Sequence, residues 1–503
     1  MEKKSNKKER ITKRAVPILF FFVIALLFFF KTLTVFGKPI TELSKEELSD
    51  IEKYINDVNI EDGVGQLLMT GIPADIYNYS NNPYLVNIIT TIGIGNFIIN
   101  GYNCERASSS TLKKGNDIPL LIKQFTEYLQ TLSKHSNLRI PLLVAADFES
   151  NQFSSIPYGL YQAPPALTLA STQNAELIRL TGNLVGFELF SVGVHIVLGP
   201  VLDIDQSIQG ELNTTLTNRS FGSTPDIIYR AASNYIRGLQ EGNVVVFGKH
   251  FPGHGSAKNN PHLYKIPSFD GSVAQLMKES LPYPEFNQYL DGIMTEHINI
   301  GFLESSAKPV TFSHAFVAEF LRNSNTIDIK GTSFKGLGYF NQIAITDDLS
   351  GMGSIIKYMD DNHLDFSTIA IQAFDAGHDL LVFSHLEVPG HPDRSRYARF
   401  TIQDLEAVKN ALISHIKKSD KAEKRFRESL KRILILKTKV SKKYAPNFKG
   451  FPDSILYSWH SNLDLDLDEF TFLKERKYKN TACFLKNVYN NAMINKQLEF
   501  RVC

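Results

Sequence analysis

The chain has 503 residues, of which 43% are hydrophobic and 21% are charged, and its formal net charge at pH 7 is +2. This composition is ordinary for a globular protein, and the nearly balanced charge argues against nucleic acid as a partner. The length allows one large α/β domain with extensions, or two to four smaller domains. The cysteines, Cys104, Cys483 and Cys503, lie far apart without a Cys-x-x-Cys pair, so we expect no redox motif and no cofactor.

The first 37 residues combine a basic segment with an apolar one. Seven lysines and arginines fall within residues 1–14, and an almost uninterrupted apolar run follows over 15–30. This pattern predicts a signal anchor in 1–37 or, as an alternative, a signal peptide cleaved near Gly37. Because the positive flank stays in the cytoplasm, we expect an inner-membrane anchor with the folded domain in the periplasm or cell envelope, or secretion after cleavage.

From residue 41 onward, apolar runs typical of buried strands alternate with helical patterns. The predicted strands cover 64–69, 95–99, 141–146, 194–198, 244–247, 292–295, 342–346 and 379–383. Helical patterns cover 41–60, 121–132, 175–189, 227–239, 312–321 and 401–440. Eight strands alternating with helices predict an α/β fold, a TIM-type (β/α)8 barrel over 38–440, with a C-terminal extension of unknown role over 441–503. A doubly wound sheet competes, but no Gly-x-Gly-x-x-Gly follows the first strand.

The most informative segment is 249–255, Lys-His-Phe-Pro-Gly-His-Gly, which follows the apolar run 244–247. A buried strand that ends in such a loop delivers titratable side chains to the rim of a barrel, where catalytic and binding residues gather. A solvated glycine-rich turn is the alternative interpretation. Other predicted strands also end in polar pairs, namely Asp147 with Glu149, Asp203 with Asp205, Glu296 with His297, and Asp347 with Asp348.

Among these acids, Asp347 stands at the strand terminus itself and is the better catalytic candidate. Asp348 is equally well explained as the N-cap of the next helix. An acid at one strand end, with acids, lysine and histidine at others, suits hydrolysis of a glycosidic bond, which needs a nucleophilic carboxylate and a proton donor.

The histidines of this region also raise the possibility of a metal site. They are His250, His254 and His262. A proline and a glycine interrupt the first pair, so it does not lie on a helix, and no His-Glu-x-x-His occurs. We therefore predict that no metal is bound.

Four segments together resemble glycoside hydrolase family 3, and most closely its β-N-acetylglucosaminidase branch. They are 200–203 (Pro-Val-Leu-Asp), 219–222 (Arg-Ser-Phe-Gly), 249–255 and 346–350 (Thr-Asp-Asp-Leu-Ser). The resemblance extends from about residue 64 to residue 437, where 429–434 is similar to the family's closing helix. It implies a retaining double displacement on a (β/α)8 barrel.

The resemblance also implies roles for individual residues. Asp347 matches the nucleophile that forms a covalent glycosyl–enzyme intermediate, and His262 matches the branch's general acid/base. The positions that match ligands of the sugar hydroxyls are Asp147, Arg219, Lys249 and His250. His254 resembles a loop-shaping residue, and His297 a structural histidine at a strand end.

The chain departs from the branch's pattern beside the acid/base. An aspartate stands two residues before that histidine in the branch, whereas this chain has Asn260, followed by Pro261 in place of a small serine. A carboxylate would raise the pKa of the imidazole and fix its tautomer, whereas Asn260 can at most orient it, as a supporting residue. The segment 147–151 also replaces the family's Asp-Gln-Glu-Gly-Gly, serine stands at 154 and 155 where an arginine is expected, and Gly351 is an extra glycine.

We therefore expect a retaining exo-β-N-acetylglucosaminidase of the cell envelope, acting on peptidoglycan fragments or chitin-type oligosaccharides. Its partners would be a carbohydrate containing N-acetylglucosamine and the membrane. A phosphorylase, in which phosphate replaces water as the acceptor, is an enzymatic variant. The alternative from another class is a catalytically weak or inactive glycan-binding barrel, which Asn260 and the altered segment 147–151 would suit.

Overall fold

The computed structural model describes residues 43–104, 118–150, 153–206, 215–216, 218–303, 307–323, 326–329, 332–338, 340–389 and 396–444. The predicted signal or anchor segment lies outside these residues, as does the predicted C-terminal extension beyond Tyr444. Among the helices that are described, none combines the length and the hydropathy needed to cross a bilayer.

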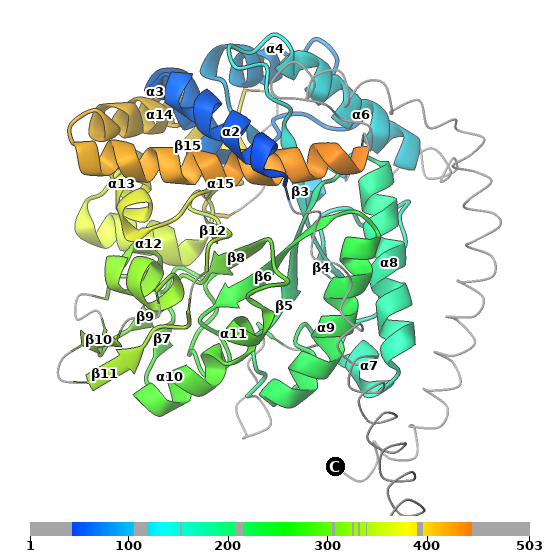
Figure 1. Ribbon diagram of the computed structural model, residues 1–503, viewed down its shortest axis with the longest axis vertical. Coiled ribbons are helices and arrows are strands. Elements are labelled where there is room, and N and C mark those ends of the chain that lie inside the picture. The colour runs from blue at the N-terminus through cyan, green and yellow to red at the C-terminus, as the bar shows by residue number, and fades with distance from the viewer. Residues whose placement is uncertain are drawn as a thin grey trace, which may run out of the picture. The chain divides into compact units, whose positions relative to one another are not determined.

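Within the described residues, eight parallel strands form a nearly closed barrel (Figure 1). Their order around the sheet is β12-β8-β6-β5-β3-β2-β1-β13, and a bridge between Ile345 and Leu380 brings β12 beside β13. The bounds are β1 Leu68–Gly71, β2 Asn96–Ile99, β3 Leu143–Ser150, β5 Ile196–Val201, β6 Val245–Phe251, β8 Gly292–Thr295, β12 Ile343–Thr346 and β13 Leu381–Phe383. The predicted parallel barrel is thereby confirmed.

These strands form because each is a short apolar run that can be buried on both faces of a parallel sheet. All residues of β5 and β6 are buried. The first predicted strand is placed too early, because residues Val64–Leu67 form a 3-10 turn, η1, and the strand starts at Leu68. Gly65 in this turn lies so close to the backbone of Gly93 that a side chain would not fit, which fixes the turn against the next loop.

Helices follow the strands along the chain and surround them (Figure 1). The α-helices are α2 Lys45–Asp57, α3 Ile60–Gly63, α4 Pro83–Val86, α5 Gly101–Cys104, α6 Ile118–Ser133, α7 Ala166–Ser171, α8 Ala175–Ser191, α9 Pro225–Glu241, α10 Val273–Ser280, α11 Pro282–Phe286, α12 Gly353–Asn362, α13 Phe366–Ala376, α14 Ile402–Ile416 and α15 Asp420–Tyr444. Two short segments are π-helical, η2 Asn87–Ile92 and η7 Ala315–Leu321, and η6 Val310–Phe312 is a 3-10 turn. The short strand pairings are β4 Phe153–Ser154 on β3, β7 Ser268–Phe269 with β9 Asn299–Ile300, β10 Thr326–Ile329 with β11 Thr332–Lys335, and β14 Leu386–Glu387 with β15 Phe400–Thr401.

Two of the predicted helical segments are divided. The segment predicted over 312–321 is split between η6 and η7. The segment predicted over 401–440 is two helices, because Ser419 accepts a hydrogen bond from the backbone N–H of Ala422 (3.1 Å) and starts α15 anew. Since α15 continues to Tyr444, the predicted domain boundary at 440 falls inside a helix.

Helix α15 is fastened to the barrel through the buried carboxylate of Asp379, which lies two residues before β13. Ser429 and the guanidinium groups of Arg425 and Arg432, all on α15, bind one carboxylate oxygen at 2.8–3.2 Å. The other oxygen accepts from the backbone N–H of Ala344 (3.0 Å) and from Arg322. Burial opposes ionisation of Asp379, but the arginine charges prevail and lower its pKa.

A second buried polar group on α15 is the side-chain amine of Lys437. It donates to the side-chain oxygen of Gln66 (2.8 Å) and to the carbonyl oxygens of Gly95 (2.9 Å) and Pro141 (2.8 Å). Gly95 and Pro141 lie just before β2 and β3, so Lys437 joins α15 to the amino ends of two barrel strands. Near it, α2 packs along α15 (Figure 1).

Removing the charge of Asp379 should destabilise the fold strongly, because the arginines around it would remain buried without compensation. We expect Asp379→Asn to lower the free energy of unfolding by about 3–5 kcal/mol, measured by chemical denaturation. The matched control is Asp375→Asn, because Asp375 is half exposed and pairs only at the surface with His415, so its loss should stay within about 1 kcal/mol. Equal effects of the two substitutions would contradict this account.

Candidate active site

The carboxyl ends of three barrel strands, β3, β6 and β12, bring most of the predicted site residues to one rim. Asp147 lies in β3, Lys249 and His250 lie in β6, and Asp347 follows β12 directly. A ring nitrogen of His250, a carboxylate oxygen of Glu296 after β8, and a carboxylate oxygen of Asp347 lie within 4.8 Å of one another. The predicted convergence of Asp347 with the Lys-His segment is therefore present in the structure.

Lys249 and Arg219 form a buried ion-pair network with two acids of β3. The Lys249 ammonium lies 2.6 Å from Asp147 and 2.8 Å from Glu149, and the Arg219 guanidinium binds both oxygens of Glu149 at 2.8 Å. Burial opposes ionisation of Glu149, but Arg219 and Lys249 lower its pKa. The side chain of Asp147 is 40% exposed, so its carboxylate can also reach a ligand.

The orientation of His250 is fixed by Asp203, which follows β5. Asp203 lies 2.8 Å from His250 Nδ1 and also accepts from the backbone N–H groups of His250 and His254. A carboxylate on Nδ1 directs the other ring nitrogen, Nε2, toward the rim. There it lies 3.5 Å from the Arg219 guanidinium.

Glu296 pairs with a second buried histidine. His254 Nδ1 lies 3.3 Å from Glu296, which also accepts from the backbone N–H of His297. Burial disfavours the charged imidazole of His254, yet Glu296 outweighs it and raises its pKa. The prediction of His254 as only a loop-shaping residue is thus incomplete, since its side chain is half of an ion pair. His297 bonds Thr311 and the carbonyl oxygen of Asp348, as predicted for a structural histidine.

The two adjacent aspartates after β12 have different environments. Asp347 is half buried, and one of its oxygens accepts from the backbone N–H of Asp348 (2.7 Å). Asp348 is buried and accepts from the backbone N–H groups of Ser350, Gly351 and Ser384. Asp348 therefore shapes the loop before α12 and is not that helix's N-cap, which is Met352. Asp347 keeps the more accessible carboxylate.

His262 lies on the loop between β6 and β7 and interacts electrostatically with Asp347. Its residue is exposed, yet the surrounding protein lowers the pKa of the ring by desolvation, and the charge of Asp347 offsets part of this effect. The side-chain oxygen of Asn260 accepts from the backbone N–H of His262 (2.9 Å). Asn260 thus supports the turn that carries His262 through its backbone, and the predicted orientation of the imidazole by Asn260 stays a prediction.

The His250, Glu296 and Asp347 groups are close enough to be considered as cation ligands. The His250 nitrogen that faces them is also 3.5 Å from a nitrogen of Arg219, and Lys249 lies in the same network. These positive charges disfavour a metal ion, so the absence of a metal stays our prediction.

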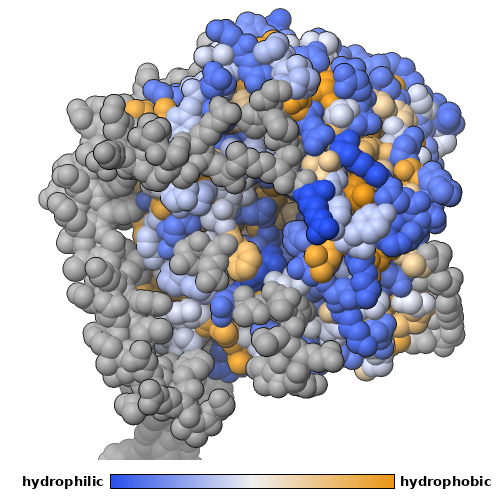
Figure 2. All heavy atoms as spheres, turned by 180° about the vertical axis from the view of Figure 1, so that it is seen from behind, coloured by the Kyte–Doolittle hydropathy of each residue, from blue (hydrophilic) through white to orange (hydrophobic). Residues whose placement is uncertain are grey.

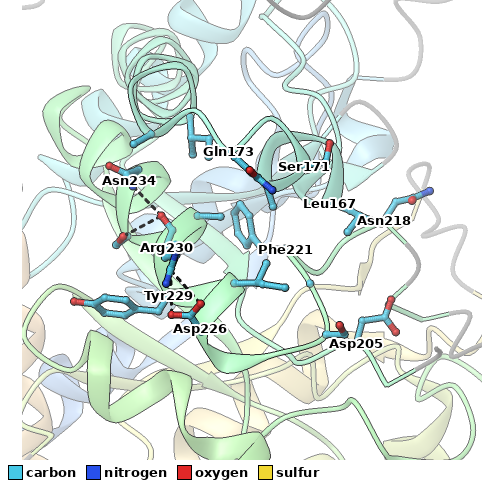
Figure 3. A pocket seen from close by; sticks show the side chains of 18 residues that line it. Leu167, Ser171, Gln173, Asp205, Asn218, Phe221, Asp226, Tyr229, Arg230 and Asn234 are labelled. Atoms are coloured by element: carbon cyan, nitrogen blue, oxygen red, sulfur yellow. Dashed lines mark hydrogen bonds and ion pairs between the residues drawn. The ribbon is translucent and has the colours of Figure 1, made fainter. Parts of the chain in front are cut away.

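A separate groove of about 940 Å³ lies on the outside of the barrel, between α7, α8 and α9. Figure 3 shows Leu167 and Phe221 in it, together with the Asp226–Arg230 ion pair. None of the predicted site residues lines it. On the face shown in Figure 2, the described surface is mostly hydrophilic with small hydrophobic patches.

Comparison with known proteins decides the family. Residues 59–436 match the glycosyl hydrolase family 3 N-terminal domain. The chain belongs to glycoside hydrolase family 3. A β-hexosaminidase of Idiomarina loihiensis is 29% identical over 276 residues, which are 53% of this chain and 76% of that relative.

Solved structures agree on the fold of this family 3 chain. A family 3 β-N-acetylglucosaminidase from Paenibacillus sp. str. FPU-7 superposes with a TM-score of 0.61 at 24% identity, covering 80% of this chain and 67% of that one. A β-N-acetylhexosaminidase from Beutenbergia cavernae gives a TM-score of 0.60 at 21% identity, covering 76% and 99%.

Three acids at the rim were predicted as polar strand ends but were assigned no role in the site, namely Glu149, Asp203 and Glu296. The signal for Glu149 was present, because residues two apart on a strand point to the same face, and Asp147 was already a candidate. Asp203 and Glu296 also follow predicted strands, but only the fold shows which histidine each one meets.

The pKa of the His262 ring should rise in one variant and fall in another, although both substitutions exchange asparagine and aspartate, whose side chains have nearly the same shape. We expect a value below the ordinary 6.5 or so, a rise in Asn260→Asp because it adds a nearby negative charge, and a further fall in Asp347→Asn because it removes one. A two-dimensional NMR titration of the histidine rings measures all three values. An unchanged pKa in both variants would contradict the electrostatic interaction between His262 and Asp347.

Proposed function

We propose that the protein is a retaining exo-β-N-acetylglucosaminidase that removes terminal N-acetylhexosamine from peptidoglycan fragments or chitin-type oligosaccharides. The observation that carries the proposal is the half-buried carboxylate of Asp347 at a strand end, within 4.8 Å of His250 and Glu296, with a negative charge that raises the pKa of His262. Family membership and curated relatives named β-hexosaminidase support the same chemistry.

In the first half of the proposed reaction, a carboxylate oxygen of Asp347 attacks the anomeric carbon as the bond to the leaving oxygen breaks. Protonated His262 gives its proton to that oxygen, and a covalent glycosyl–enzyme remains. In the second half, neutral His262 takes a proton from water, whose oxygen attacks the anomeric carbon and releases Asp347. Two displacements retain the anomeric configuration.

The lowered pKa of His262 bears differently on the two halves. A neutral imidazole is the form that accepts the proton of water, so desolvation favours the base role. The acid role requires the protonated form, which the negative charge of Asp347 promotes. Because no carboxylate stands at position 260, we propose that Asp347, together with Glu296, supplies the negative charge that supports the acid role.

The buried network on the other side of the rim would hold the sugar. The Lys249 ammonium and the half-exposed carboxylate of Asp147 are placed to bond hydroxyl groups, while Glu149 holds Lys249 and Arg219 in position. Charged groups that are already paired need little reorganisation when a sugar binds. We also propose that the N-terminal segment anchors the protein at the inner membrane, with this site in the periplasm or cell envelope.

The proposal predicts that the full chain hydrolyses 4-nitrophenyl β-N-acetylglucosaminide and prefers it to the β-glucoside. Asp347→Ala should abolish turnover, since it removes the nucleophile, and Asp361→Asn, which changes an exposed acid of α12, should not. Release of nitrophenol measures the rate. Binding of N-acetylglucosamine without turnover by the unsubstituted chain would instead favour the glycan-binding alternative.

A further inference from the structure

The loop that carries His262 is docked on the helix that follows the proposed nucleophile. Its base is closed by backbone hydrogen bonds between Lys258 and Ser268. Its tip meets α12, which begins six residues after Asp347. The position of His262 relative to Asp347 therefore depends on the contact between the loop and α12 as well as on β6, the strand that precedes the loop.

The first contact is at the amino end of α12. The first turn of a helix has backbone N–H groups without partners inside the helix, and the N-cap Met352 provides no side-chain acceptor. The carbonyl oxygen of Pro261 accepts from the backbone N–H of Ser354 (3.0 Å) and fills this place. At Gly353 the backbone of Leu263 approaches so closely that a Cβ atom would collide with its carbonyl group.

The second contact is two turns further along the helix. The hydroxyl of Tyr264 donates to Asp360 Oδ2 (2.7 Å), and the other oxygen of Asp360 accepts from Arg399 (2.7 Å). The Tyr264 ring stacks on Tyr397 at 5.8 Å between centroids, and the Lys357 ammonium lies 5.7 Å from it. Tyr264 is thus the residue whose side chain holds the far end of the loop.

We propose that Tyr264 is a positioning residue that keeps the loop docked on α12 through Asp360 and so places His262 for proton transfer. The inference rests on the proposed function. Tyr264 is 41% exposed and lies two residues beyond His262, so its hydroxyl contributes to the docking of the loop more than to the stability of the barrel. Loss of the hydroxyl should weaken acid catalysis and leave the nucleophile unaffected.

Two substrates separate these effects in the full chain. The leaving group of 2,4-dinitrophenyl β-N-acetylglucosaminide departs without a proton, whereas that of N,N′-diacetylchitobiose needs one. We expect Tyr264→Phe to lower kcat/KM about 10-fold on the disaccharide and less than about 2-fold on the dinitrophenyl substrate. Complete loss of general acid catalysis would be about 10²–10⁴-fold.

A second variant tests the same contact without changing the tyrosine. Gly353→Ala should give the same difference between substrates, because its Cβ would displace the loop at Leu263. The controls are Gly101→Ala, where a Cβ meets open space, and Tyr289→Phe, which removes a tyrosine hydroxyl that is bonded to Gln288. Both controls should leave the two rates unchanged.

A measurement independent of turnover follows the loop itself. Trypsin cleavage after Lys265, which is exposed on this loop, should be faster in Tyr264→Phe and Gly353→Ala than in the unsubstituted chain. Equal losses on both substrates, or unchanged cleavage, would overturn the positioning role while leaving the proposed function intact. An unsubstituted chain that cleaves neither substrate would overturn both.

Discussion

The barrel depends on closure of its parallel sheet between β12 and β13, and a buried aspartate fastens each end of that junction. At the amino ends, Asp379 binds the backbone of Ala344 and the arginines of α15 and Arg322. At the carboxyl ends, Asp348 binds the backbone N–H of Ser384 after β13. Asp347 stands on this junction, so the position of the proposed nucleophile follows from how the sheet closes.

The same junction also governs the acid/base side of the rim. Helix α12 continues the chain from the loop that Asp348 shapes, and the loop of His262 docks on that helix. The positions of both proposed catalytic groups, Asp347 and His262, therefore depend on the junction between β12 and β13. The sugar-binding candidates on β3 and β6 are instead held to one another by the pairing of Lys249 with Asp147 and Glu149.

Much of the fold could be predicted from the sequence because buried parallel strands are short apolar runs with polar ends. The strand at Gly292–Thr295 coincides with its prediction, whereas the predicted start of β1 is too early because Val64–Leu67 is a buried turn whose burial resembles that of a strand. Which side chains pair across the rim could not be predicted without the fold. His254 and Glu296 are far apart in the chain, and nothing in the local pattern of either indicates the other.

The burial of Lys437 makes its contribution to the stability of the fold depend on pH. Its amino group is buried among neutral oxygens, and this burial places its pKa well below the ordinary value. Between the two pKa values the unfolded chain holds a proton at this lysine that the folded chain has released. Folding therefore expels a proton, and the contribution of this site to stability increases as the pH rises through that window. A pH-stat record of proton uptake during unfolding would detect it, and Lys437→Met would remove it. This contribution acts at the amino ends of β2 and β3, the end of the barrel opposite the proposed catalytic rim.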